Sequence, residues 1–116
     1  MSKRSKACDI SQGVRQEVME RDKGCIFCQM GYHMPPTEDY LITMNQFEIM
    51  HFIPRSQGGL GIKENLAVGC KYHHMMLDNG RDTRDEMIAL FECVLRKCYK
   101  EWNRKNLIYD KWSFLK

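Results

Sequence analysis

Four possible metal ligands occur in this sequence as two pairs with the same spacing. The pairs are Cys25-x-x-Cys28 and Cys70-x-x-His73. Two residues between ligands allow a tight turn to direct both side chains at one ion, and two such turns supply the tetrahedral set typical of structural Zn²⁺. Cys25 and Cys28 alone could equally be buried apolar residues or a redox pair. The second pair favours zinc.

The other three cysteines have no partner at this spacing. Cys8 is interpreted as a thiol in a terminal tail, and Cys98 falls on the apolar face of a predicted helix, so we expect it in the core; Cys93 also has no partner. An even total of six also fits disulfides. The first ten residues are polar and basic, however, without the apolar segment of a signal peptide. We therefore expect reduced thiols in an intracellular protein.

Three further polar residues interleave with the metal pairs. His51 ends an apolar segment, Asn65 follows a glycine-rich loop, and His74 comes directly after the second pair. A neutral imidazole can accept a proton near neutral pH or bind a divalent ion. Each residue also has an ordinary interpretation: a hydrogen-bonded rim histidine, a loop or helix cap, and a zinc ligand in place of His73. The spacing from Cys70 favours His73 for zinc.

This order of His, Asn and His around a cysteine pair resembles the HNH nuclease family with its ββα-metal fold. The resemblance covers "EIMHFIPRSQGGLGIKENLAVGCKYHHMMLDNG", residues 48–80. Before it, "VRQEVMERDKGCIFC" resembles the lead-in helix and first zinc knuckle of the family. The "PRSQGGLGI" loop and the "HHMMLDNG" ending are most similar to phage-encoded members.

The resemblance implies a metal-dependent DNA endonuclease that hydrolyses phosphodiester bonds. His51 would be the general base and Asn65 would hold the strand that carries it. His74 would bind a catalytic divalent ion (Mg²⁺, Mn²⁺ or Ni²⁺), separate from the structural Zn²⁺. The implied partners are DNA and phage packaging proteins, and the implied location is the cytoplasm of a bacterial host. The sequence does not indicate an oligomeric state.

One position departs from the family pattern. The family commonly has Asp or His, a ligand of the catalytic metal, immediately before the base, and this chain has Met50. A thioether is a poor ligand for Mg²⁺ or Mn²⁺. Glu48, on the same face of a strand, or Asp78, one helical turn after His74, could supply the missing ligand. Otherwise His74, phosphate and water hold the ion loosely in a weaker enzyme. The alternative function is an inactive zinc module that binds nucleic acid or a protein.

Candidates for DNA contact are less specific. Arg55 follows the strand of the base and could contact a flanking phosphate, although a solvated loop arginine is an equal interpretation. Lys63 and Lys71 are weaker candidates. The formal net charge of +3 permits nucleic-acid binding without arguing for it.

The elements that must position these residues form one small α+β domain, as expected for 116 residues. We predict a flexible basic tail over 1–10. Residues 11–81 are predicted to form a ββα-metal core that is stabilised by zinc and includes an N-terminal helix. Residues 82–116 are predicted to form a helix and a tail that pack on the same domain. The sequence predicts one or two strands over residues 41–53, with a hairpin near Asn45, and a short helix over residues 70–77. No segment approaches the about 18 apolar residues needed to span a membrane. Apolar residues at helical spacing predict one long amphipathic helix after Asp82: Met87, Ile88, Phe91, Val94, Leu95, Cys98 and Trp102.

Overall fold

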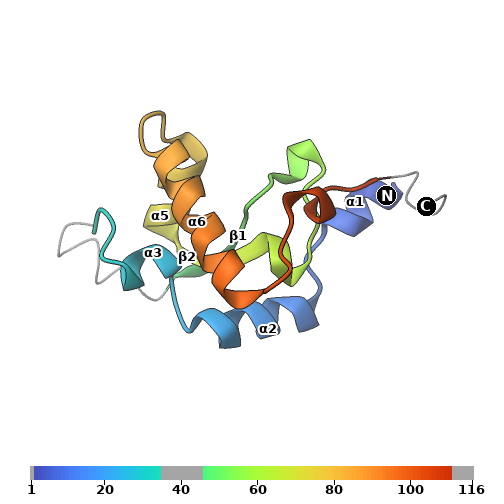
Figure 1. The fold of residues 1–116 in the computed structure, drawn as a ribbon, viewed down its shortest axis with the longest axis horizontal. Coiled ribbons are helices and arrows are strands. Elements are labelled where there is room, and N and C mark those ends of the chain that lie inside the picture. Colours follow the sequence, from blue (N-terminus) through green and yellow to red (C-terminus); the bar gives the residue numbers. More distant parts are fainter. Residues whose placement is uncertain (1, 35–45, 111–116) are drawn as a thin grey trace.

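A two-stranded antiparallel sheet lies at the centre of the computed structural model, with helices around it (Figure 1). The structure describes residues 2–34 and 46–110. The predicted α+β class is confirmed. The helices are α1 (Lys3–Cys8), α2 (Gln12–Asp22), α3 (Ile26–Gln29), α5 (Lys71–Asn79) and α6 (Arg84–Cys98); the strands are β1 (Phe47–His51) and β2 (Leu66–Cys70); short 3-10 turns are η1 (Arg55–Gln57), η2 (Lys63–Asn65) and η3 (Arg104–Leu107).

The sheet places the end of β1 beside the start of β2. His51 pairs with Leu66 and Met50 with Ala67. β2 leads directly into α5, so the second metal pair stands at the junction of the strand and the helix. β1 lies within the segment predicted as strand, whereas the predicted turn near Asn45 lies outside the described residues. β2 is buried along its whole length and shows no alternation of apolar and polar residues, so its sequence carries a weak strand signal.

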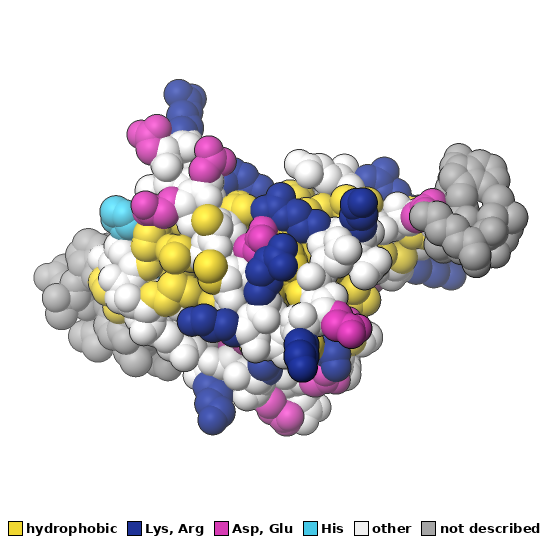
Figure 2. All heavy atoms as spheres, viewed as in Figure 1, with side chains coloured by type: hydrophobic (Ala, Val, Ile, Leu, Met, Phe, Trp, Pro, Cys, Tyr) yellow, Lys and Arg dark blue, Asp and Glu magenta, His cyan; other side chains and the backbone are white. Residues whose placement is uncertain are grey.

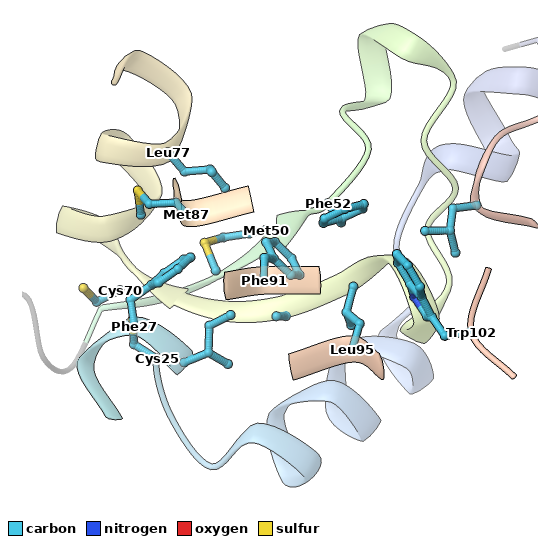
Figure 3. Packing of buried hydrophobic residues seen from close by; sticks show 13 residues of the cluster. Cys25, Phe27, Met50, Phe52, Cys70, Leu77, Met87, Phe91, Leu95 and Trp102 are labelled. Atoms are coloured by element: carbon cyan, nitrogen blue, oxygen red, sulfur yellow. The ribbon is translucent and has the colours of Figure 1, made fainter. Parts of the chain in front are cut away.

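Two apolar clusters cover the two faces of the sheet. The larger one joins β1 to α6 through Met50 and Phe91, which lie close together at its centre (Figure 3). The smaller one lies between α2 and the sheet, where Val18 packs with Ile49 and Val68. Because successive side chains of a strand point to opposite faces, Ile49 and Met50 enter different clusters.

The predicted long helix is confirmed as α6, and its apolar positions Met87, Phe91 and Leu95 are fully buried. The prediction that Cys98 belongs to the core is wrong, because this residue is exposed. Cys98 is the last residue of α6, and the chain leaves helical geometry at Tyr99. Trp102 lies beyond the helix and returns to the core, where its indole N–H donates to the Glu64 carbonyl at 2.7 Å.

The N-terminal residues differ from the predicted loose tail. Residues 3–8 form α1, whose first turn is capped by the Ser2 hydroxyl accepting from the Ser5 amide at 3.1 Å. Cys8 is 2% exposed and is therefore a buried residue, not a tail thiol. The tail interpretation rested on charge alone. The helix is held by backbone contacts to a distant loop, including a bond from the Gly61 amide to the Ala7 carbonyl at 3.0 Å.

The segment after α6 packs back on the domain over its described part. Leu107 is buried, and Ile108 forms a bridge with Gly59. Residues 111–116 lie outside the described part of the chain. Within that part, no helix has the length and apolarity that crossing a membrane requires.

Candidate metal centre and histidine site

Cys25, Cys28, Cys70 and His73 bring their ligand atoms together within 4.8 Å of one another. The Sγ atoms of Cys28 and Cys70 are 3.7 Å apart. The Nδ1 atom of His73 lies 3.5 Å from the Sγ atoms of Cys25 and Cys28 and 3.2 Å from that of Cys70. Tetrahedral Zn²⁺, with Zn–S near 2.3 Å and Zn–N near 2.0 Å, places such ligand atoms about 3.5–3.8 Å apart. The four residues therefore fit structural zinc.

Two similar turns present these ligands. Cys25 stands at the N-cap of α3, where its Sγ accepts from the Cys28 amide at 3.4 Å. Cys70 stands at the N-cap of α5, where its Sγ accepts from the His73 amide, also at 3.4 Å. The two-residue spacing noted in the sequence thus corresponds to one turn at the start of each helix. Each turn aims a pair of ligands at the same point.

The surroundings of the cluster orient His73 for metal binding. His73 Nε2 lies 2.6 Å from the Tyr32 carbonyl, so this nitrogen carries the proton and Nδ1 is left to bind a metal. Burial raises the pKa of the Cys28 thiol well above its ordinary range, and the neighbouring Cys25 and Cys70 sulfurs raise it further. A metal cation would reverse this effect, because its charge stabilises thiolates.

His51 lies at the last position of β1, half-buried, with Nε2 3.2 Å from the Cys8 carbonyl. Its pKa is lowered, chiefly by burial and further by electrostatic interaction with Arg55 and His74. The contact with the Cys8 carbonyl opposes this shift. The net result is a ring that is neutral at neutral pH.

His74 lies between the two carboxylates proposed from the sequence as additional ligands. Its Nδ1 atom is 2.9 Å from Glu48 Oε1, and its Nε2 atom is 3.5 Å from Asp78 Oδ2. Asp78 lies on the same helix, four residues on, whereas Glu48 reaches across from β1. The two acidic residues therefore contact opposite nitrogens of the same ring.

Asn65 is fully buried and fastens the loop between the strands. Its Oδ1 accepts from the Ile53 amide at 2.8 Å, while its Nδ2 donates to the carbonyls of Leu60 at 2.8 Å and Ile53 at 3.2 Å. The Asn65 carbonyl also accepts from the Phe52 amide at 2.8 Å. These bonds fix the backbone immediately after His51.

Met50 does not reach the histidine site from the core. Its side chain is 0% exposed and belongs to the large apolar cluster. A Cβ atom added at Gly69 would come within 2.4 Å of the Met50 sulfur, so Met50 lies directly over this glycine of β2. The position is a packing position in this fold.

His51 and His74 line one open hollow on the surface, together with Asp78 and Arg55. Arg55 is held there by Asp9, whose carboxylate lies 2.6 Å from its Nη2. Lys63 and Lys71 do not line this hollow; Lys63 instead pairs with Glu17 at 3.0 Å. Sequence reasoning missed three charged residues of the lining because they are distant in the chain and belong to no motif. These are Asp9, Arg15 and Arg84.

The charge on one face of the molecule is mixed. Lys and Arg side chains alternate with Asp and Glu over the face shown in Figure 2. This mixture agrees with the small net charge of +3.

No protein-family model, curated protein or solved structure matches this chain.

Proposed function

We propose that the protein is a small, zinc-stabilised, metal-dependent DNA endonuclease of the HNH type. One observation carries the proposal: a neutral histidine and a carboxylate-flanked histidine, His51 and His74, line the same hollow. The two-stranded sheet followed by α5 is the arrangement that a ββα-metal core requires. The Cys/His cluster holds the start of α5 and so supports the site from outside it.

Within this proposal His51 accepts the proton of the attacking water. A histidine suits this role when it is uncharged at the working pH and lies at the edge of a pocket open to solvent. Its lowered pKa and half-buried position meet both conditions. Asn65 holds the chain after the base and is a positioning residue.

His74 and Asp78 would hold the catalytic ion between them. Two ligand atoms at about 2.0–2.2 Å from one ion lie about 3–3.5 Å apart, and Nε2 of His74 is 3.5 Å from Asp78 Oδ2. Glu48 contacts Nδ1, the other ring nitrogen of His74. It would orient the ring, as a carboxylate commonly does when it bonds the second nitrogen of a metal-bound histidine. When bound, a divalent ion between these two residues would supply positive charge to the phosphate and to the departing oxygen.

Three arginines of the hollow suit a phosphodiester. Arg15 and Arg84 line it from α2 and α6, and Arg55 lines it from η1. Guanidinium groups bind phosphate oxygens through paired hydrogen bonds. Arg15 is exposed, on the same side as the histidines, and is available for such a contact.

A second candidate function rests on Met50. Because this residue lies in the core, position 50 supplies no ligand, and the proposed ion would be held by the pair His74 and Asp78. Over the described part of the chain, the group of three or more close His, Cys, Asp or Glu side chains that could hold a metal is the Cys/His cluster, which lies outside the hollow. The same fold without catalysis would be a zinc module that binds nucleic acid or a protein.

A plasmid-cutting assay separates the two functions. Wild type, His51→Ala and His74→Ala are incubated with Mg²⁺, Mn²⁺, Ni²⁺ or no added ion, and His33→Ala, an exposed histidine outside the hollow, is the matched control. We expect ion-dependent cutting by wild type and the control, and a loss of about 100-fold or more in the two site variants. Equal cutting by wild type and His51→Ala with every ion would reject the nuclease. DNA binding retained without cutting would support the module.

A further inference from the structure

The chain at the end of α1 contacts two side chains of the hollow, His51 at the end of β1 and Arg55 in η1. The Cys8 carbonyl lies 3.2 Å from His51 Nε2 and accepts from Arg55 Nη1 at 2.9 Å. The next residue, Asp9, binds the same guanidinium through its carboxylate at 2.6 Å. One short stretch of backbone therefore meets two site residues more than 40 positions away in the chain.

This stretch is firmly placed. Arg4 donates to the Ser56 carbonyl at 3.0 Å, and Ala7 accepts from the Gly61 amide at 3.0 Å. A Cβ atom added at Gly61 would lie 2.0 Å from the Asp9 carbonyl oxygen and 3.0 Å from that of Cys8. The close approach of the two backbones thus depends on a glycine at position 61.

A carbonyl oxygen can only accept a hydrogen bond, and a neutral imidazole carries its proton on one nitrogen. The nitrogen facing Cys8 must therefore be the protonated one. The lone pair then resides on Nδ1, the nitrogen that can take a proton from water. Arg55, held at two of its nitrogens, is likewise restricted in direction.

We propose that α1 and Asp9 form a positioning element of the histidine site, in which the Cys8 carbonyl selects the Nε2–H tautomer of His51 and, with Asp9, directs Arg55 along the hollow. The catalytic meaning of this element rests on the proposed nuclease function. The tautomer itself does not, because it follows from the contact with the carbonyl.

NMR of the histidine ring nitrogens, recorded on the whole chain loaded with zinc, tests whether the Cys8 carbonyl selects the tautomer of His51. Long-range ¹H–¹⁵N correlations at neutral pH report which His51 nitrogen is protonated, and the His51→Ala spectrum assigns the ring. Gly61→Ala displaces the Cys8 and Asp9 backbone. Gly13→Ala is the matched control, because a Cβ atom there meets nothing within 4 Å. Zinc content and thermal unfolding show which variants are folded.

We expect the Nε2–H tautomer in wild type and in Gly13→Ala. In Gly61→Ala we expect ring-nitrogen chemical shifts of His51 that indicate a mixture of tautomers. We also expect the cutting rate to fall about tenfold, which is a fraction of what a general base contributes. A wild-type ring protonated on Nδ1 overturns the proposal, as does a folded Gly61→Ala protein with an unchanged ring. If Gly61→Ala does not fold, the wild-type tautomer alone decides. The expected tautomers in a protein that never cuts DNA would reject the nuclease while retaining the positioning role of α1.

Discussion

At the scale of single residues, His74 shows what spacing can and cannot predict. Its contact with Asp78 follows from their four-residue separation on one helix. Its contact with Glu48 depends on how α5 packs against β1, which no local pattern encodes. The sequence therefore presents Glu48 and Asp78 as alternatives for one ligand position. The structure assigns them to opposite nitrogens of the ring, and so to different tasks.

The cutting rate should depend on pH through His51. In the proposed reaction the neutral ring is the active form, and its pKa is lowered chiefly by burial and further by the positive charge of Arg55. The rate should therefore rise with pH and reach half of its plateau below the ordinary histidine pKa of about 6.5. A profile of kcat/KM against pH measures this midpoint.

Arg55→Gln provides the matched comparison, since it removes one of the charges that lower the pKa. Its midpoint should move upward relative to wild type. A wild-type midpoint above that of a free histidine would contradict the assignment of His51 as the base.

Met50→Asp should destabilise the protein and should not restore a metal ligand. The side chain is fully buried among apolar residues, where a carboxylate would have no partner. We expect the free energy of unfolding to fall by about 3 kcal/mol or more. Urea unfolding of the zinc-loaded protein measures it, with Met75→Asp, at a position 54% exposed on α5, as the control. A stable variant that cuts DNA faster would show that position 50 does reach the ion.

At the scale of elements, the predictable parts are those with local periodicity. α6 is visible in the sequence because its buried residues recur every four positions, at Met87, Phe91 and Leu95. α1 could not be predicted from its basic sequence, because its place is set by contacts with Ser56 and Gly61. The same holds for the Asp9, Arg15 and Arg84 lining of the hollow, which tertiary packing alone brings to the histidines.

Asn65→Ala should loosen the loop that joins the strands. The change leaves the Ile53 amide and the Leu60 carbonyl without their partner in a buried setting. Three hydrogen bonds are lost, and we expect about 2–3 kcal/mol of lost stability. Urea unfolding measures the change. Asn79→Ala, which removes one exposed bond to the Met75 carbonyl, is the control. Equal small effects of the two substitutions would contradict this account of Asn65.

Asp22→Ala should separate α2 from β2. The Asp22 carboxylate accepts from the Val68 amide at 2.8 Å and pairs with Arg21 at 2.7 Å, and its side chain is nearly fully buried. Removing it leaves the buried Val68 amide without a partner, whereas Arg21 keeps its bonds to the Lys63 and Leu66 carbonyls, so we expect a loss of about 1–3 kcal/mol. The midpoint of thermal unfolding should fall well below that of Glu20→Ala, which changes an exposed carboxylate of the same helix. Similar midpoints would show that the apolar contacts of α2 and the bonds from Arg21 to the Lys63 and Leu66 carbonyls hold the helix without Asp22.

At the scale of the whole molecule, the metal cluster joins parts that the chain keeps far apart. Cys25 and Cys28 belong to the N-terminal half, and Cys70 and His73 lie more than 40 residues later. A chain of this size buries a modest apolar core, so a metal ion bound by these four residues would contribute strongly to its stability. The sequence could predict this cluster because its spacing is local within each turn. That the two turns lie side by side and bind one ion is inferred from their similar ligands and equal spacing.

Removal of zinc should therefore weaken the entire fold rather than one site. We expect one Zn²⁺ per chain by elemental analysis, and a large fall in the midpoint of thermal unfolding when a chelator is added, because the ion binds the folded chain far more tightly than the unfolded one. Cys70→Ser should lose the ion and the stability together. Cys93→Ser, which changes an exposed thiol outside the cluster, should keep both. Full stability of the Cys70 variant without zinc would mean that the apolar clusters on the two faces of the sheet suffice. In that case α5 would present His74 and Asp78 to the hollow through its packing against β1 and α6 alone.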